Sequence, residues 1–245
     1  MRMRKKKNSE SRLGACSDVL YAHNCDTPMA DPSSVVGKSG APAFLEIGAG
    51  KGRFAVEMAR RNPDCAYFAM ERVTDCVVLA AERASSAEGG KIENLRFIID
   101  TADNLLHIFE KGSIGKIFLN FSDPWSKKGY AKRRLTHRRY LALYMNLLSD
   151  GGELCFKTDN RALFDFSLEE IEAMGLKCDV VTYDLHASEW NEGNIMTEYE
   201  ENFSSQGMSI NMLEFVKPAG MNPPIDPSFL KPSYLPSAEG IGDKD

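Results

Sequence analysis

Apolar and polar positions along residues 43–217 follow two different periods. The pattern predicts strands at about 43–48, 65–71, 95–99, 116–121, 153–157, 177–184 and 209–216. Between the first five strands, apolar side chains recur every three or four residues, which predicts helices, for example over about 51–61. Strands that alternate with helices are typical of an α/β fold, here a doubly wound sheet whose first five strands are parallel.

The two ends of the chain lack this periodicity. Residues 8–42 are rich in Ser, Asp, Pro and Gly and predict an irregular arm. Residues 218–245 hold six of the eleven prolines and have little to bury, so they predict a disordered or loosely docked tail. We therefore divide the chain into an arm over 1–42, a domain over 43–217 and a tail over 218–245.

Residues 44–54 combine an apolar strand, a glycine-rich turn and the start of a helix. The pattern E-x-G-x-G-x-G begins at Glu46 and ends at Gly52, and Arg53 stands where the dinucleotide fingerprint requires its third glycine. This spacing disfavours a nicotinamide dinucleotide. Glu71 ends the next strand, nineteen residues after Gly52, and suits a ribose diol. The stretch therefore favours a nucleoside cofactor over a plain turn.

Polar side chains follow most of the predicted parallel strands. In a doubly wound sheet, ligands bind beyond the carboxyl ends of the strands, near the point where the strand order reverses. The side chains at these ends are Glu46, Glu71, Asp100, Thr101, Asp123 and Asp159. We expect them to line one site.

The charge of the chain is unevenly distributed, although the net charge is −5. Residues 1–7 hold five cations and residues 127–139 hold seven, with no acid in either segment. The other 18 cations face 35 acids. Such segregation favours a phosphate-binding patch for nucleic acid over the alternative, a solvated helix face. The seven cations of the second segment are Lys127, Lys128, Lys132, Arg133, Arg134, Arg138 and Arg139.

Composition excludes several classes of protein and site. No apolar run is long enough to span a bilayer, and the basic N-terminus has no apolar core behind it, so we expect neither a membrane protein nor a secretory signal. Six scattered cysteines, without C-x-x-C or paired histidines at metal spacing, predict reduced thiols, a cytoplasmic protein and no metal site.

Two polar stretches carry candidate chemistry. Pro124 restricts Asp123 to extended backbone at the rim of the cofactor pocket. Trp125 either stacks on a base or ribose or serves as a packing lid, and the sequence leaves both open. In the second stretch, residues 196–201, the carboxylates suit the donors on the Watson–Crick edge of guanine, and Asp159 and Glu200 are the candidates. The alternative is an acidic loop that is only solvated.

Several motifs together resemble the bacterial tRNA (guanine-N7-)-methyltransferases. The glycine turn is similar to the first motif of class I S-adenosylmethionine-dependent methyltransferases, and the chain opens with Met1-Arg2-Met3-Arg4, as that family does. The further motifs are residues 120–128 (NFSDPWSKK), 132–135 (KRRL), 156–161 (FKTDNR) and 193–201 (GNIMTEYEE).

The resemblance implies a Rossmann-like fold, a seven-stranded, mostly parallel sheet with helices on both faces and an antiparallel last strand. It implies methyl transfer from S-adenosylmethionine to N7 of guanine 46 in the variable loop of tRNA, by a monomer or homodimer. It assigns Asp123 as the catalytic residue. The residues implied to bind the cofactor are Glu46, Gly48, Glu71, Thr101 and Asp123. Those implied to bind tRNA are Lys127, Asp159, Thr197, Glu198, Tyr199 and Glu200.

The chain departs from the family pattern at two positions. Thr101 stands where the family has Asp or Asn, so the adenine contact falls to Thr101, to backbone N–H groups or to Asp100. Ser126 replaces a proline of the family motif. The rival readings are a methyltransferase that acts on a protein or small molecule, and an RNA-binding module with a vestigial fold.

Overall fold

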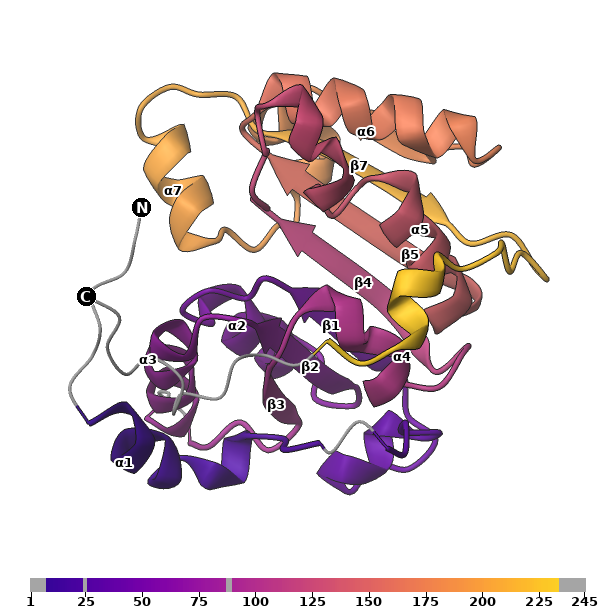
Figure 1. Cartoon of the computed structure of the whole chain (residues 1–245). Helices are drawn as coiled ribbons and strands as arrows, with labels where there is room; N and C mark the ends of the chain where they lie inside the picture. Colours follow the sequence, from indigo (N-terminus) through magenta and orange to yellow (C-terminus); the bar gives the residue numbers. More distant parts are fainter. Residues whose placement is uncertain (1–7, 24–25, 87–89, 234–245) are drawn as a thin grey trace, which may run out of the picture.

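The computed structural model describes residues 8–23, 26–86 and 90–233. In this part of the chain seven strands form one sheet in the order β3-β2-β1-β4-β5-β7-β6 (Figure 1). The strands are β1 (Ala43–Ile47), β2 (Ala66–Glu71), β3 (Leu95–Ile99), β4 (Ile114–Asn120), β5 (Leu148–Thr158), β6 (Val180–Thr182) and β7 (Asn211–Val216). β7 pairs antiparallel with both β5 and β6, while β1 to β5 pair in parallel. The predicted mostly parallel sheet with an antiparallel last strand is confirmed.

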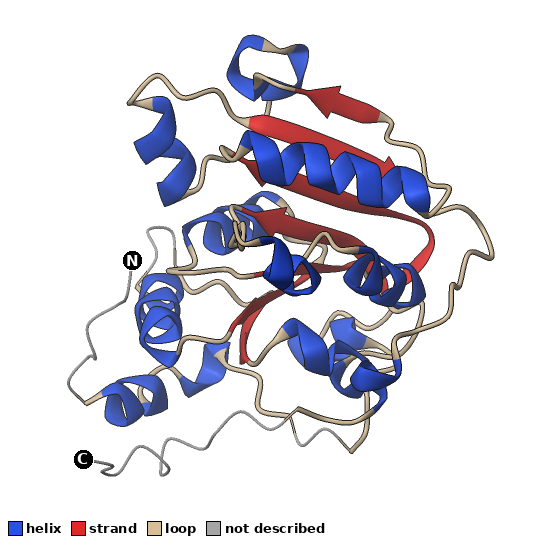
Figure 2. Ribbon diagram, turned by 45° about the horizontal axis from the view of Figure 1, so that its top comes forward, coloured by secondary structure: helices blue, strands red, loops and turns tan. Residues whose placement is uncertain are grey.

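Helices cover both faces of the sheet (Figure 2). One core combines alternate strand residues with α4, α5 and α6, and a second core combines the other strand residues with α2 and α3. The helices are α1 (Ser9–Gly14), α2 (Arg53–Arg61), α3 (Thr74–Ser85), α4 (Leu105–Ile108), α5 (Arg138–Leu147), α6 (Arg161–Ala173) and α7 (Glu198–Ser204). The α/β architecture predicted from the two periods is therefore confirmed.

Strand alternation decides which side chains of β1 reach the candidate site. Leu45 and Ile47 belong to the core under α4, α5 and α6. Glu46 lies between them, so its side chain leaves the strand on the opposite face, toward α2. β1 is third in the sheet, with β2 on one side and β4 on the other, so the strand order reverses between β1 and β4. This is where a doubly wound sheet binds its ligand.

Helix α5 begins at a histidine cap and runs directly into β5. Thr136, just before the helix, is buried and accepts a hydrogen bond from Ser167, while the His137 side chain accepts the capping bond from the backbone N–H of Arg139. Gly151 and Gly152 lie inside β5, where the β4–β5 register shifts. A Cβ at Gly152 would come within 2.9 Å of the Ser149 carbonyl oxygen, so this irregularity needs glycine.

The arm and tail make more contacts than their composition suggests. In the arm, Arg12 of α1 pairs with Glu82 of α3 at 2.7 Å. In the tail, which is yellow in Figure 1, Phe229 is fully buried against Tyr140 of α5. The expectation of a tail with little to bury is therefore wrong for residues 218–233, because Met221 and Ile225 also pack against the core under α4, α5 and α6. Residues 1–7 and 234–245 lie outside the described part, and the division into three regions stays a prediction.

Candidate active site

The glycine turn after β1 exposes its backbone to open space. Gly48, Gly50 and Gly52 have φ angles of 86°, 55° and 74°, which favour glycine. A Cβ at Gly48 or Gly50 would meet nothing within 4 Å, so a ligand can approach the backbone there. At Gly52 the reason for glycine is packing, because a Cβ would lie 2.7 Å from the Cβ of Ala80 in α3.

Glu71 holds this turn in place from the end of β2. Its Oε2 accepts a hydrogen bond from the backbone N–H of Gly50 at 3.0 Å, and its Oε1 accepts one from Val73 at 2.8 Å. A carboxylate has about four lone-pair positions, so it retains acceptors for a diol. The structure thus brings Glu71 and the glycine turn together.

Glu46 is a buried carboxylate that the protein satisfies only in part. Its side chain is fully buried, and Oε1 accepts a hydrogen bond from Asn120 Nδ2 at 3.0 Å. Oε2 has no hydrogen-bond partner among the described residues. Burial raises the pKa of Glu46 to about 7, against the opposing effects of Asn120, of the positive charge of Lys157 and of the nearby Tyr67 hydroxyl. Such a group gains from a cationic ligand.

Other unpartnered polar atoms lie at the ends of the neighbouring strands. Buried atoms without a partner in the described part of the chain include Thr101 Oγ1, Asn120 Oδ1 and Ser122 Oγ. Unpaired buried polar atoms are rare in folded proteins and cost free energy, so a group of them indicates a ligand site. The open glycine turn, Glu46 and these atoms fit a nucleoside carrying a cationic side chain, as S-adenosylmethionine does.

The structure distinguishes between the candidates for the adenine contact. Asp100 is buried, and its carboxylate is bound by His23 at 2.8 Å and by Asn104 at 2.7 Å. Its Oδ1 also accepts the backbone N–H of Thr101 at 2.6 Å. The hydroxyl of Thr101, by contrast, has no partner within the described ranges. The geometry therefore favours Thr101 over Asp100.

Asp123 lies at the mouth of this site on strained backbone. Its side chain is 71% exposed, and its Oδ2 lies 3.8 Å from Arg72 Nη2. Phe121 and Trp125, on either side of it, have φ angles of 52° and 41°, a region that costs a bulky residue about 1–3 kcal/mol. Strain of this kind persists where the surrounding structure fixes the backbone, and here it occurs on both sides of the residue expected to be catalytic.

Trp125 packs on the basic segment. The Arg133 guanidinium lies 5.0 Å from the centre of its ring, and Tyr130 makes an edge contact at 5.8 Å. Arg134 donates hydrogen bonds to the carbonyl oxygens of Pro124 and Trp125. Of the two readings of Trp125, these contacts favour the packing role.

The basic segment 127–139 is less available to phosphate than its composition indicates. Arg138 forms a bidentate pair with Glu170 at 2.8 and 2.9 Å, and Arg139 lies over the ring of Phe229. With Arg134 bound to carbonyl oxygens, three of the seven cations hold the fold together. The other four are all exposed, and we call them the rim cations: Lys127, Lys128, Lys132 and Arg133.

Glu200 lies in a buried polar network, which the sequence did not indicate. Its side chain is fully buried, and its oxygens are bound by Lys157 at 2.6 Å, Asn194 at 2.6 Å and His186 at 2.9 Å. Burial acts to raise the pKa of Glu200, but the charge and hydrogen bond of Lys157 outweigh it and lower the pKa. Asn194 belongs to the segment that leads into α7, and Lys157 belongs to β5. The network thus fixes α7 to the sheet.

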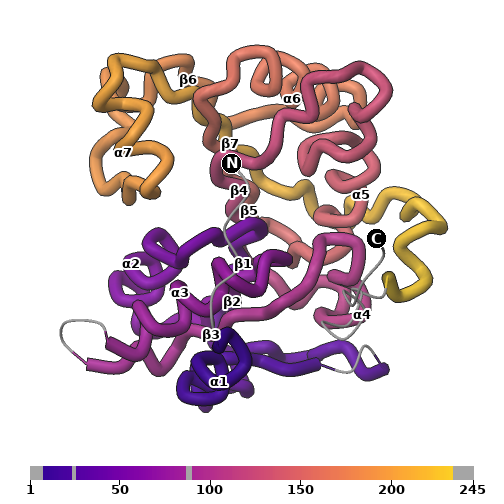
Figure 3. The backbone as a smooth tube through the Cα atoms, turned by 60° about the vertical axis from the view of Figure 1, so that its left-hand side comes forward, coloured from indigo at the N-terminus to yellow at the C-terminus, as the bar shows by residue number. Residues whose placement is uncertain are grey.

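Helix α7 begins inside the second polar stretch, residues 196–201. The hydroxyl of Thr197 accepts the backbone N–H of Glu200 at 2.9 Å and caps the helix. The pattern Thr197-x-x-Glu200 is a capping-box signal that could have predicted this helix. Glu198 pairs with Lys51, just before α2, and with Arg83 in the last turn of α3, and α7 lies next to α2 (Figure 3). Tyr199 is 60% exposed.

The expected site residues lie in two groups. Glu46, Glu71, Thr101 and Asp123 follow or end β1, β2, β3 and β4, which are neighbours in the sheet. The rim cations follow β4 in the chain, the half-buried Asp159 follows β5, and α7 is joined by ion pairs both to β5 and to α3. The polar residues that sequence reasoning missed are Arg72, Asn120, Ser122, Lys157 and His186.

The described ranges contain neither a metal-binding cluster nor a membrane-spanning helix. No group of three or more His, Cys, Asp or Glu side chains there is arranged to hold a metal ion. None of the helices in those ranges has the length and apolar character to cross a bilayer.

Comparison with known proteins identifies the family. A family model described as "Putative methyltransferase" matches residues 40–213. The chain is 43% identical to the tRNA (guanine-N(7)-)-methyltransferase of Lachnoclostridium phytofermentans, over 79% of this chain and 92% of that protein. It is 40% identical to the protein of the same name from Bacillus subtilis, over 81% and 94%. It is 46% identical to that from Bacillus cytotoxicus, over 71% and 78%.

Solved structures share the fold at much lower identity. An antibiotic-related methyltransferase aligns with a TM-score of 0.57 and 15% identity, over 80% of this chain and 98% of that one. The 16S rRNA methyltransferase KamB aligns with a TM-score of 0.56 and 12% identity, over 89% and 96%. These neighbours support the fold alone, whereas the curated relatives are similar enough in sequence to decide membership. The chain belongs to the tRNA (guanine-N7)-methyltransferase family.

Proposed function

We propose that this protein transfers a methyl group from S-adenosylmethionine to N7 of a guanine in tRNA, at nucleotide 46 in the variable loop. The names of its relatives support the reaction. The observation that carries the proposal is the buried carboxylate of Glu46, whose Oε2 lacks a partner in the described residues. Glu46 lies where the strand order reverses, beside the open glycine turn. The rim cations lie at the same mouth, after β4.

Four residues would hold the cofactor. Glu71 accepts the ribose hydroxyls, and Thr101 binds the adenine with its unpartnered hydroxyl. Glu46 offers its carboxylate to the cationic amino acid end, and Gly48 lets that end lie against the backbone. The cofactor, when bound, supplies an activated methyl group on a sulfonium centre.

Asp123 would act on the guanine. The N7 lone pair is unprotonated at neutral pH, so no strong general base is required. Methylation leaves a positive charge on the purine, and a carboxylate fixed beside the ring stabilises that charge as it develops. The strained backbone at Phe121 and Trp125 supports this role, because strain of this kind is typical of active-site loops.

The residues proposed for the tRNA side either contact the substrate or hold helix α7 in position. Lys127 binds phosphate, Asp159 accepts the N–H donors of the guanine edge, and the exposed Tyr199 offers a ring for stacking. Thr197 and Glu198 hold α7 in position through the helix cap and the ion pairs to α2 and α3. Glu200 contributes from inside the protein by fixing α7 through Lys157. A cytoplasmic location and a monomeric or dimeric state stay predictions.

The proposal is tested with labelled S-adenosylmethionine and an unmodified tRNA transcript, followed by mapping of the labelled base. We expect label at N7 of guanine 46, and none on a transcript with adenine at that position. Asp123→Asn, whose shape is nearly unchanged, should lose most of the rate, because its amide cannot stabilise the positive charge on the guanine. Label on another nucleotide, or transfer to protein instead of RNA, would show that the proposal is wrong.

A further inference from the structure

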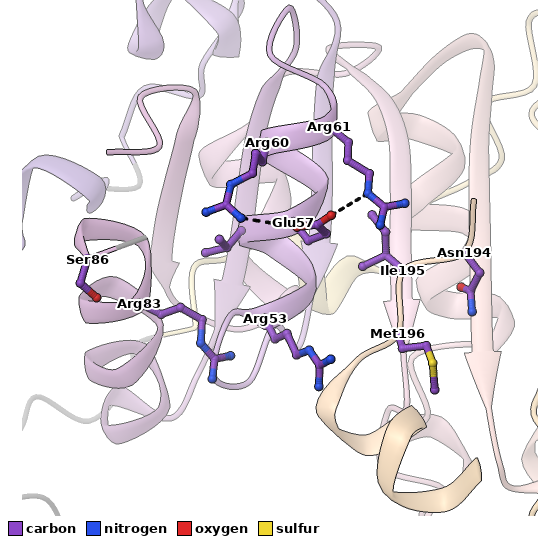
Figure 4. A pocket seen from close by; sticks show the side chains of 10 residues that line it. Arg53, Glu57, Arg60, Arg61, Arg83, Ser86, Asn194, Ile195 and Met196 are labelled. Carbon is purple, nitrogen blue, oxygen red and sulfur yellow. Dashed lines mark hydrogen bonds and ion pairs between the residues drawn. The ribbon is translucent and has the colours of Figure 1, made fainter. Parts of the chain in front are cut away.

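A second cationic surface lies outside the site described above. A groove of about 510 Å³ runs between α2, α3 and residues 194–196. Figure 4 shows Arg60 and Arg61 on either side of Glu57, with Arg53 and Arg83 directed toward the end of the groove nearest α7. Of the described residues that line this groove, four are arginines and one is acidic. We call it the arginine groove.

Helix geometry gathers these charges on one face. Arg53, Glu57, Arg60 and Arg61 are separated by four, three and one residues, so the side chains lie along one side of α2. Arg83 joins them from α3. The floor is apolar, because Val56 and Ile195 are buried there. An apolar floor with a guanidinium rim suits a strand of nucleotides, which presents flat apolar bases and charged phosphates together.

The ion pairs now formed by the arginines are easily exchanged. Arg83 pairs with Glu198 at 2.5 Å, Arg61 pairs with Glu57 at 2.7 Å, and Arg53 pairs with Glu201. The four arginine side chains are 36–47% exposed. Exposed pairs of this kind contribute about 0–1 kcal/mol. A phosphate, which accepts two hydrogen bonds from one guanidinium, can therefore replace a carboxylate partner.

The groove begins next to the candidate active site in the chain. Arg53 directly follows Gly52 of the glycine turn, and Met196 in the groove wall directly precedes Thr197, the cap of α7. From Arg53 to Arg61 the helix rises about 12 Å, which is long enough to contact more than one phosphate. The rim cations lie between β4 and α5, and α5 packs on the face of the sheet opposite α2.

We propose that the arginine groove is a second phosphate-binding surface, which holds the backbone of the RNA substrate on the α2 side of the mouth. The proposal rests on the proposed function in taking RNA as the polyanion. Two surfaces on either side of Asp123 bind the RNA at separate points and so orient the guanine between them. The groove adds affinity and orientation, and it takes no part in cofactor binding.

The experiment compares tRNA binding by the full chain and by Arg60→Gln/Arg61→Gln over a series of salt concentrations. Each lost phosphate contact lowers the slope of log K against log salt by about 0.7–0.9, so we expect the double variant to lose about 1.4–1.8. Its KM for tRNA should rise, while kcat at saturating tRNA and the affinity for S-adenosylmethionine stay at the values of the unmodified protein. If the double variant does not fold, Arg61→Gln alone should lose half of that slope.

The matched control is Lys111→Gln/Lys177→Gln, which removes two exposed cations from loops outside the groove. Its slope should equal that of the unmodified protein. An unchanged slope in the arginine variant, or an equal loss in the control, would show that the arginine groove does not bind the RNA backbone. Methylation by the unmodified protein is measured in the same series. If it fails, the proposed function fails, while the difference in slope still tests the groove.

Discussion

Two glutamates, Glu46 and Glu200, are fully buried at the carboxyl edge of the same sheet, yet their surroundings are opposite. Glu200 is bound by Lys157, Asn194 and His186, and its pKa is lowered. Glu46 has one amide partner, and its pKa is raised to about 7. A carboxylate satisfied inside the protein stabilises the fold, whereas one left without a cation is suited to bind a ligand. Burial alone does not distinguish the two roles, and the partners do.

The largest effect should come from breaking the satisfied pair. Lys157→Met leaves the Glu200 carboxylate buried without its cation, and removing one partner of a buried pair costs about 3–5 kcal/mol. Urea unfolding should show this loss in the free energy of unfolding. Lys157→Met/Glu200→Gln removes both charges and should regain most of it. A single variant within 1 kcal/mol of the unmodified protein would contradict the contrast.

The next effect concerns stability against pH. Folded Glu46 titrates at about 7 and the unfolded group at 4.5, so between these values the folded state holds more protons and the free energy of unfolding falls as pH rises. The full penalty above pH 7 is about 3 kcal/mol. Glu46→Gln should lack this penalty, so the difference in the free energy of unfolding between the variant and the unmodified protein should grow from pH 4.5 to 7. The stability that Glu200 contributes should instead be present above pH 4.5 and be lost as pH falls through its lowered pKa. A flat difference curve for Glu46→Gln would contradict the assignment.

The third effect is on cofactor binding. If Glu46 binds the cationic end of S-adenosylmethionine, the ionised form must bind better, and the affinity should rise about tenfold from pH 6 to pH 8. Calorimetry near pH 6.5 should also detect a proton released on binding. Glu46→Gln should bind more weakly and show no such rise. If both proteins show the same pH dependence of the affinity, a group other than Glu46 causes it.

The smallest effect should come from Glu198, two residues before Glu200. Its ion pairs with Lys51 and Arg83 are partly exposed, so Glu198→Gln should change the free energy of unfolding by no more than about 1 kcal/mol. Urea unfolding in low and high salt provides the measurement. A loss as large as that of Lys157→Met would show that burial of the pair is not what separates these neighbouring glutamates.

The sequence predicted the order of the elements and the residues at the strand ends. Glu46, Glu71 and Asp123 each stand next to an apolar run and a turn, so their positions depend on local pattern. The number of cations in segment 127–139 overstates how many are available to phosphate, because Arg138 and Arg139 contact Glu170 and Phe229, far along the chain. Composition reports how many cations a segment has but not which of them are already bound.

The sequence by itself determined the alternation of strands and helices, the glycine turn and the edge at which the polar residues gather. These follow from periods of two and 3.6 residues, which a local segment contains in full. Only the tertiary structure decided which carboxylate is satisfied and which is not. Glu46 meets Asn120 across 74 residues, and Lys157 meets Glu200 across 43. Such pairings depend on how the sheet and helices pack, and packing is a property of the whole chain.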